Sequence, residues 1–357
     1  MNKLNLLTML LLMAVCPLFA ENGPFPQFDD YPLPKEATLF GEKVPLDDMF
    51  VFERFDREFT IIVWDRPQIF MWLKRSGRYF PYIEKRLREE GMPEDLKYVA
   101  VAESSFHSHI RSKSGAVGMW QFMKYTAKKK GLMNNRGIDE RRHFEKSTDA
   151  AMEYFKELYD KFGVWNLAIA AYNCGQGRLE KAMKEQGADD YYNLKLPKET
   201  ERYLFRILAI KMIMENPKKY GYNLSPERYY KPYEYDSVSV NVKFPVSIIE
   251  VLKKTDVNYK RFRDLNPHLT GSLFPTGKYD VNIPDGNRSD LVSAINNITE
   301  NELKHLKYNP DKYYKVQPGD TLIGISVKTG VSVKNLKRLN HLNGSFIRVG
   351  QKLLLKP

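Results

Sequence analysis

The sequence has few cysteines and no long apolar run after its first residues. Its two cysteines, Cys16 and Cys174, exclude a disulfide-stabilised scaffold and a multi-cysteine zinc or iron–sulfur site. Beyond residue 20 no apolar stretch is long enough to cross a bilayer, which excludes a polytopic membrane protein. Acidic residues are also in deficit, 44 against 56 basic ones, so the formal charge is +12. This charge favours an anionic partner but does not choose between nucleic acid, a membrane surface and an acidic polymer.

Apolar residues make up 43% of the chain and aromatic residues 13%, which excludes a disordered chain. The length of 357 residues indicates about two or three domains. The first segment, residues 1–20, has a basic start at Lys3, an apolar run and small residues before Ala20, and we interpret it as an export signal. The alternative is a retained membrane anchor. Cys16 could accept a lipid as in bacterial lipoproteins, although Val15 stands where a smaller residue is usual.

The remaining chain divides by pattern. Residues 21–79 form a proline-rich arm and a helical lead-in, and the stretch from about 46 to 225 has mainly helical periodicity. Strand-type alternation begins near residue 237, and a repeat follows at an offset of 74, with Thr255, Val257 and Asn266 matching Thr329, Val331 and Asn340. Each copy predicts strand, helix, helix and strand, over 238–285 and 312–357, with 287–310 as a linker or connecting helix. We expect binding modules, or alternatively one repeat-built domain without a binding role.

One carboxylate lies on an apolar helix face. Leu96, Val99, Ala100 and Glu103 follow each other at helical spacing, so Glu103 should point toward the interior. Burial disfavours the ionised carboxylate and raises its pKa, as a general acid near neutral pH requires. A structural glutamate satisfied by backbone donors or an ion pair would show the same periodicity, and the two interpretations stay equally open at this point.

Three further segments contain polar groups beside small or apolar residues. Residues 112–118 form a turn of small residues that lets backbone approach a ligand. Met119 and Trp120 follow, and we expect them to form an apolar wall beside the acid. Farther on, Tyr172 and Asn173 precede two glycines at a helix end, and residues 199–203 open the next apolar helix.

These motifs, in this order, resemble the catalytic domain of lytic transglycosylases, the lysozyme-like enzymes that cleave bacterial peptidoglycan. The resemblance covers about residues 80–215 and implies a mainly α, lysozyme-like catalytic domain, which we expect over residues 80–225. It implies that Glu103 is the single catalytic acid/base, acting without a partner carboxylate. It also implies the residues that line the substrate site, namely Ser112, Met119, Gln121, Tyr172, Asn173, Glu199 and Tyr203.

The repeat resembles LysM, a small α+β module that binds the glycan backbone of peptidoglycan. The copy at 312–357 contains the Pro-Gly-Asp-Thr motif, whereas 238–285 is degenerate because Phe244-Pro245-Val246-Ser247 replaces that motif. The resemblance implies that the motif residues of the second copy belong to the glycan-binding module, namely Gly319, Asp320, Thr321, Leu322 and Asn340. The whole arrangement resembles the membrane-bound type of murein transglycosylase.

Other candidate residues carry weaker signals. Asp139, Glu140 and Glu145 lie among basic residues, and we expect a solvated, ion-paired segment rather than a second catalytic group. His107 and His109 lack an evident third ligand, so we expect no metal and no other cofactor. Cys174 is expected to be a small filler rather than a nucleophile.

The sequence therefore predicts a peptidoglycan lytic transglycosylase with a glycan-binding tail. A hydrolytic muramidase and a noncatalytic wall-binding protein are the alternatives. The expected partners are glycan strands and, for the positive charge, acidic peptide stems and anionic envelope lipids; nucleic acid is not expected after export. The expected location is the bacterial envelope, in the periplasm, with Cys16 as the candidate anchor to the outer membrane.

Overall fold

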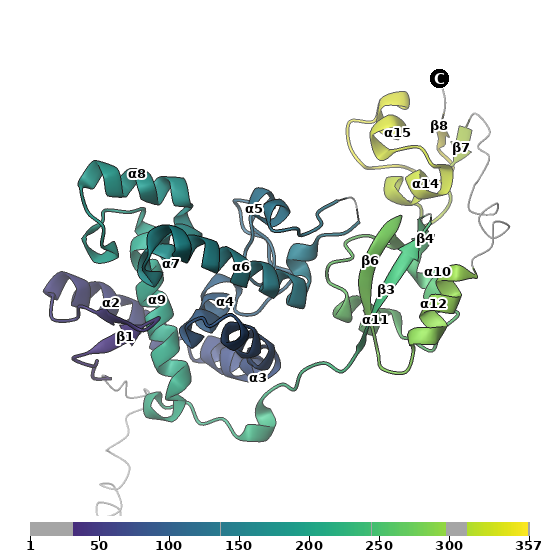
Figure 1. Ribbon diagram of the computed structural model, residues 1–357. Helices are drawn as coiled ribbons and strands as arrows, with labels where there is room; N and C mark the ends of the chain where they lie inside the picture. The colour runs from purple at the N-terminus through teal and green to yellow at the C-terminus, as the bar shows by residue number, and fades with distance from the viewer. Residues whose placement is uncertain (1–30, 136, 244, 298–312, 356–357) are drawn as a thin grey trace, which may run out of the picture. The chain divides into compact units, whose positions relative to one another are not determined.

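The computed structural model describes residues 31–135, 137–243, 245–297 and 313–355 (Figure 1). The expected export signal, with Cys16 and Ala20, lies outside these residues, as does most of the expected linker. The chain divides into two compact units. The first contains residues up to Thr126 together with Phe144–Pro232, and the second contains Ala127–His143 and the chain from Tyr233 onward.

The first unit is mainly helical, as the sequence predicts. A short hairpin precedes its long helices, and single 3-10 turns lie between several of them. Its elements are β1 (Ala37–Leu39), β2 (Glu42–Val44), α2 (Met49–Val63), α3 (Arg66–Glu89), η1 (Glu94–Leu96), α4 (Lys97–Ser104), α5 (Lys124–Lys129, which ends in the second unit), α6 (Phe144–Phe162), α7 (Trp165–Cys174), α8 (Gln176–Gln186), η3 (Tyr191–Asn193), α9 (Lys198–Glu215), η4 (Pro217–Tyr220) and η5 (Pro226–Arg228).

Helix α9 forms the centre of this unit, since α2, α3, α4 and α7 all pack against it. Most of its apolar residues are almost completely buried, from Leu204 at 1% exposed to Ile213 at 0%. Helices begin where side chains can satisfy free backbone N–H groups. Asp48 accepts from the N–H groups of Phe50 and Val51 at the start of α2. The central position of α9 matters for the site because its first two turns carry Glu199 and Tyr203.

The second unit contains two separate apolar cores. The first core belongs to a module in which β3 pairs with β6 in antiparallel register, from Asp236 opposite Ile283 to Val242 opposite Gly277. Between them lie the two predicted helices and a short strand pair, and a further helix follows. The elements are β3 (Asp236–Val242), β4 (Val246–Ser247), α10 (Ile248–Leu252), α11 (Tyr259–Leu265), β5 (Leu273–Phe274), β6 (Gly277–Ile283) and α12 (Arg288–Asn296).

Two segments outside the repeat complete this module. Leu291 and Ala294 of α12 lie in its core, and so does Ile138 from the segment 127–143. That segment forms backbone hydrogen bonds with the module, from Asp139 N–H to the His268 carbonyl at 2.8 Å and from Thr270 N–H to the Gly137 carbonyl at 2.9 Å. The first copy of the repeat is thus built together with residues that precede it by about a hundred positions in the chain.

The expectation of a solvated segment around Asp139 is wrong. Asp139, Glu140 and Arg141 are only 9%, 4% and 6% exposed. Asp139 and Arg141 do form the expected ion pair, with two N–O contacts of 2.8 Å. The Glu140 carboxylate accepts from the Met133 N–H at 2.7 Å. Pairing of this kind allows charged groups to be buried beside Ile138.

The C-terminal module repeats the strand, helix, helix and strand order, with Tyr313–Lys315 (β7) paired to Lys352–Leu354 (β8). Its helices are α14 (Leu322–Thr329), which starts at the Thr321 cap, and α15 (Val333–Leu339). The predicted change from a mainly helical region to small strand-containing modules is therefore confirmed.

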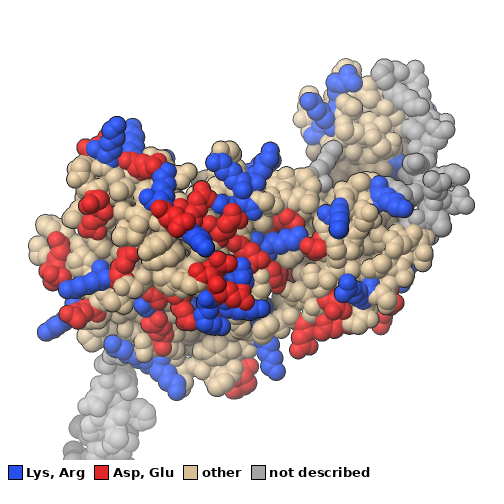
Figure 2. Space-filling view, viewed as in Figure 1, with Lys and Arg blue, Asp and Glu red and all other residues tan. Residues whose placement is uncertain are grey.

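Acidic and basic side chains are interspersed on the face drawn in Figure 2, so this face does not concentrate the net positive charge. Within the described ranges, no helix is both long and apolar enough to cross a membrane.

Candidate active site

Glu103 lies in the last turn of α4, on the face that packs into the first unit. Leu96, Val99 and Ala100 on this face are all 0% exposed, while Glu103 itself is only partly buried. The helix ends directly afterwards because Ser105 and Phe106 adopt left-handed backbone conformations, with φ of 54° and 65°. Two successive non-glycine residues in this region are strained and need support from their surroundings.

Helix α3 supplies that support. The Ser105 hydroxyl accepts hydrogen bonds from Trp72 Nε1 at 2.9 Å and from Gln68 Nε2, and the Ser105 carbonyl accepts from Arg75 at 2.9 Å. These three α3 side chains therefore fix the point at which α4 ends and Glu103 stands. Sequence reasoning did not identify them, because in the sequence they belong to an ordinary amphipathic helix.

The Glu103 carboxyl is electrostatically perturbed. Burial raises its pKa from the ordinary 4.5 to about 7; the Tyr203 hydroxyl opposes this by donating a hydrogen bond, while the charge of Glu199 adds to it and that of Arg206 subtracts. The direction is the one expected from the helix face. A carboxyl with this pKa is substantially protonated near neutral pH and can donate a proton, then take one back.

Tyr172 connects α7 to the turn that precedes α5. Its hydroxyl donates to the Trp120 carbonyl at 2.5 Å, and burial, followed by the nearby Glu103 charge, raises its pKa well above the ordinary value. Asn173 is held from α9, since its Oδ1 accepts from the Thr200 hydroxyl at 2.7 Å. Tyr172, Tyr203 and Glu103 thus lie within electrostatic reach of one another, although they come from three different helices.

The turn of small residues is closed by its own hydrogen bonds. The Ser112 hydroxyl accepts from the Ala116 N–H at 3.0 Å. Gln121 has a left-handed backbone, with φ of 49°, and its Nε2 donates to the Gly118 carbonyl at 2.7 Å. These contacts shape the turn locally, and they engage the Ser112 hydroxyl as an acceptor and the Gln121 amide as a donor.

The expected apolar wall of Met119 and Trp120 is not on the surface. Met119 is 1% exposed and Trp120 is 0% exposed. Trp120 is buried because its indole N–H has a partner, the Thr148 hydroxyl at 3.0 Å, and because its ring packs edge-on against Phe155 at 5.7 Å. Both side chains pack on the buried side of the turn, and almost no surface of Met119 is exposed for contact with a sugar.

Glu199 is exposed in the first turn of α9, and it is the carboxylate whose charge raises the pKa of Glu103. The motif position of Glu199 predicts only that it lines the substrate site, and the structure adds its through-space interaction with Glu103, 96 positions away. It bears on the choice between transglycosylation and hydrolysis, because hydrolytic glycosidases usually work with two carboxylates.

His107 and Cys174 both lie in the described part of the chain. It contains no group of three His, Cys, Asp or Glu side chains arranged to hold a metal ion. The His107 ring instead contacts the Ser104 carbonyl at 2.9 Å. Burial raises the pKa of the Cys174 thiol, which keeps it in its less nucleophilic form.

In the C-terminal module the motif residues stabilise the fold through hydrogen bonds, a helix cap and a core contact. Asp320 accepts from Tyr314 at 2.8 Å and from Lys328 at 2.5 Å, next to Gly319 in a left-handed turn with φ of 83°. Thr321 caps α14 by accepting from the Gly324 N–H at 3.0 Å. Leu322 is 2% exposed and lies in the core.

Asn340 joins α15 to β8. Its amide donates to the Leu336 and Leu354 carbonyls at 2.8 and 2.9 Å and accepts from the Leu354 N–H at 2.6 Å. Both ends of this side chain are therefore engaged within the protein.

Comparison with known proteins agrees with this arrangement. Residues 80–195 match the family model described as transglycosylase SLT domain, and residues 314–356 match the LysM domain. Membrane-bound lytic murein transglycosylase D from Escherichia coli K12 is 32% identical over 293 residues, which are 79% of this chain and 64% of that protein. The chain thus spans less than two thirds of the length of this relative.

Two other similarities cover less than half of this chain. A putative tributyltin chloride resistance protein from an Alteromonas species is 28% identical over 153 residues, 41% of this chain and 74% of that protein. The 70 kDa soluble lytic transglycosylase from Escherichia coli aligns in structure over 43% of this chain and 27% of its own, at 20% identity and a TM-score of 0.34.

Proposed function

Because the chain carries a transglycosylase SLT domain at 80–195 and a LysM domain at 314–356, we propose that it is a peptidoglycan lytic transglycosylase with a glycan-binding tail. Its substrate is the β-1,4 bond between N-acetylmuramic acid and N-acetylglucosamine. The observation that carries the proposal is the Glu103 carboxyl, whose pKa of about 7 lets one group serve as acid and then as base.

The reaction proceeds in two proton transfers. Glu103 first protonates the glycosidic oxygen as it leaves C1 of N-acetylmuramic acid. The resulting carboxylate then takes the proton from the C6 hydroxyl of the same sugar while that oxygen bonds to C1. The product is a 1,6-anhydro ring, water is not consumed, and Glu103 returns to its protonated form. The Tyr203 hydrogen bond stabilises the carboxylate between the two steps.

Substrate contacts follow from the motif positions around Glu103. We assign to Ser112, Gln121, Asn173 and Glu199 the binding and orientation of the sugars. Glu199 is exposed at the start of α9, where a sugar hydroxyl can donate to it. Met119 contributes through packing beneath the turn, in keeping with its burial.

The wider cellular role is also part of the proposal. A wall-degrading activity places the chain in the bacterial envelope, and the name of the relative described as membrane-bound supports this location. We propose anchoring through Cys16 and attraction of the basic chain to anionic envelope lipids. Removing residues 311–357 should weaken binding to intact wall and leave cleavage of short soluble glycan unchanged; an equal loss of both would contradict a separate binding tail.

The product identifies the reaction. Purified sacculi are digested in water labelled with heavy oxygen, and the released muropeptides are weighed by mass spectrometry. Transglycosylation gives unlabelled products that are lighter by one water molecule than hydrolytic products. Glu103→Gln should bind sacculi and release nothing, whereas Glu185→Gln, on the exposed side of α8, should cut normally.

Hydrolysis is the second candidate reaction. It is supported by the charge interaction between Glu199 and Glu103, because hydrolytic glycosidases usually use two carboxylates. A muramidase would incorporate heavy oxygen at the new reducing end, and Glu199→Gln would then abolish labelling. A noncatalytic wall-binding protein would release no muropeptide even as the unaltered chain. Each of these outcomes would refute the transglycosylase assignment.

A further inference from the structure

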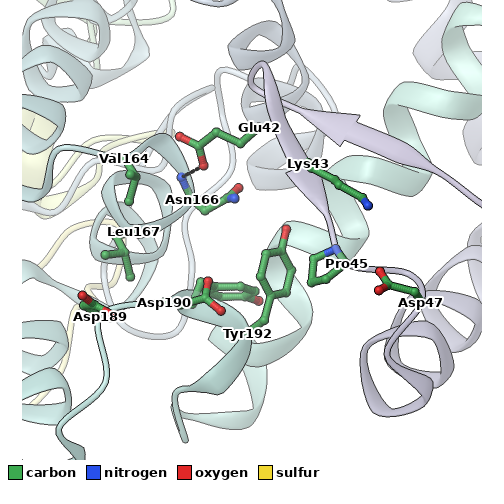
Figure 3. A pocket seen from close by; sticks show the side chains of 11 residues that line it. Glu42, Lys43, Pro45, Asp47, Val164, Asn166, Leu167, Asp189, Asp190 and Tyr192 are labelled. Carbon is green, nitrogen blue, oxygen red and sulfur yellow. Dashed lines mark hydrogen bonds between the residues drawn. The ribbon is translucent and has the colours of Figure 1, made fainter.

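A pocket of about 500 Å³ lies in the first unit at the N-terminal end of α7 (Figure 3). Its walls come from β2 and the residues after it, from the start of α7 and from η3. Asn166 lines the pocket, whereas Asn173 near Glu103 stands two turns farther along the same helix, about 10 Å away by helix rise. The pocket is therefore separate from the catalytic carboxyl, and none of its lining residues belongs to the motifs described above.

Carboxylates dominate the pocket. Glu42, Asp47, Asp189 and Asp190 line it together with one lysine, Lys43. Glu42 already serves the helix, since its oxygens accept from the N–H groups at the start of α7, at 2.5 Å from Trp165 and 3.2 Å from Asn166. Asp190 accepts from the Asn193 side-chain amide at 3.0 Å. Four carboxylates against one lysine give the pocket a negative excess that repels anions.

The negative field also reaches a pocket tyrosine. Burial raises the pKa of the Tyr192 hydroxyl well above its ordinary range. The charges of Asp190 and Glu42 raise it further, while the Arg54 charge and a hydrogen bond with the Asn166 side chain lower it. The phenol therefore stays protonated and offers both a donor hydrogen and an acceptor lone pair.

Two buried polar atoms on residues that line this pocket lack a hydrogen bond of standard geometry among the described residues, although the Asn166 side chain is near enough to the Tyr192 hydroxyl to lower its pKa. They are Oδ1 of Asn166 and the hydroxyl of Tyr192, on side chains only 6% and 9% exposed. In Figure 3 the Asn166 amide and the Tyr192 hydroxyl are turned toward each other between Glu42 and Lys43. A buried acceptor without a donor is costly, and a ligand that brings N–H groups removes that cost.

We propose that this pocket binds a primary ammonium group carried on a short apolar chain. The ammonium supplies three donors and a positive charge, which match an amide oxygen, a phenol oxygen and the aspartates. Pro45, Val164 and Leu167 line the same pocket and provide apolar contact for the methylene groups. Its volume of about 500 Å³ is in the usual range for small-ligand pockets.

Two sources share this chemistry: the side-chain amine of a peptide attached to glycan, and a small free diamine. Binding of the first kind would add peptide recognition to the proposed function, whereas the pocket itself does not depend on that function. A hydrogen-bonded path also leads from the pocket toward the catalytic motif. The Tyr191 hydroxyl donates to the Thr200 carbonyl at 2.7 Å, and the Thr200 hydroxyl donates to Asn173.

The primary test is binding of Nα-acetyl-lysine amide to the full chain, measured by calorimetry and compared with the same probe acetylated on its amine. We expect saturable binding of the free amine, and binding of the acetylated probe weaker by about tenfold or more. Tyr192→Phe removes only the hydroxyl, and Asp189→Asn with Asp190→Asn removes charge. Each should weaken binding by about tenfold.

Asp160→Asn removes an exposed carboxylate of α6 outside the pocket and should change nothing. If Tyr192→Phe fails to fold by circular dichroism, the exposed Asp47→Asn takes its place. Absence of saturation, equal binding of the acetylated probe, or undiminished binding by the aspartate variant would each overturn the proposal.

The source is decided in a Glu103→Gln background, in which glycan is not cut. A soluble muropeptide with a free side-chain amine is competed against 1,5-diaminopentane. Tighter binding of the muropeptide assigns the pocket to wall peptides, and tighter binding of the diamine assigns it to small amines. Failure of the two to compete would refute a single ammonium site. None of these outcomes depends on whether the chain cleaves glycan.

Discussion

Replacing Glu103 by glutamine should make the folded protein more stable while it abolishes the proposed cleavage. The Glu103 pKa is about 7 in the folded chain and 4.5 ordinarily. Below pH 4.5 the group is protonated in both states and contributes nothing. Between these values the unfolded chain ionises while the folded chain does not, so wild-type stability falls as pH rises through this window. The loss is complete above about pH 7.

The magnitude follows from the size of the shift. A difference of about 2.5 pKa units, from 4.5 to about 7, corresponds to about 3 kcal/mol of unfolding free energy above neutral pH. Glutamine never ionises, so Glu103→Gln avoids this loss. Its carbonyl oxygen can still accept the hydrogen bond from Tyr203, which keeps the packing of α4 on α9 intact.

Urea unfolding followed by circular dichroism measures this difference at about pH 4, 6 and 8. The two proteins should be nearly equally stable at the lowest pH, and Glu103→Gln should lead by up to about 3 kcal/mol at the highest. Glu185→Gln, an exposed substitution of the same type, should show no such trend. A difference that does not change with pH, or that favours the wild type as pH rises, would refute the burial argument for Glu103.

Three other substitutions test separate contacts. Tyr203→Phe removes a bond that lowers the Glu103 pKa, so the alkaline fall of kcat/KM should move to higher pH; a move to lower pH contradicts this. Ile138→Ala should cost the first module about 2–5 kcal/mol and speed hydrogen exchange in β3 and β6, and unchanged protection would exclude its core role. Asn340→Ala should destabilise the C-terminal module by about 2–4 kcal/mol in thermal unfolding, while the exposed Asn335→Ala should not.

The sequence predicts those parts of the site that depend on local periodicity. The position of Glu103 on an apolar helix face follows from spacing within one helix, and so does the direction of its pKa shift. Its hydrogen bond from Tyr203 joins residues 100 positions apart, and helical spacing contains no information on such a pair. The support of Ser105 by α3 is invisible for the same reason, although Trp72 and Arg75 are readily found as parts of a helix.

The sequence pattern does not predict which polar and aromatic side chains are buried. Charged residues are usually solvated, and the sequence predicts this for the segment around Asp139, yet pairing between Asp139 and Arg141 allows both to be buried. The sequence predicts Trp120 as part of an apolar wall beside the acid, yet its indole N–H donates to the Thr148 hydroxyl inside the fold. In each case burial depends on whether the polar group has a hydrogen-bonding or ionic partner in the folded chain, and the sequence pattern does not identify that partner.

The two repeat copies show which features such a module needs and which it can replace. Both retain the helix caps at an offset of 74, with Ser247 equivalent to Thr321, and both retain the asparagine that joins the second helix to the last strand. Asn266 makes the same kind of bonds to Asn282 that its equivalent makes to Leu354.

The polar cluster of the C-terminal copy is not retained in the first. Tyr314 and Asp320 hydrogen-bond to each other there, and their equivalents at the same offset are Val240 and Val246, both of which lie in the apolar core of the first copy. That core is enlarged by Ile138 and by α12, neither of which belongs to the repeat. The first copy has therefore exchanged a polar turn for apolar contacts with added segments. The first copy therefore keeps the strand, helix, helix and strand order without the Pro-Gly-Asp-Thr motif.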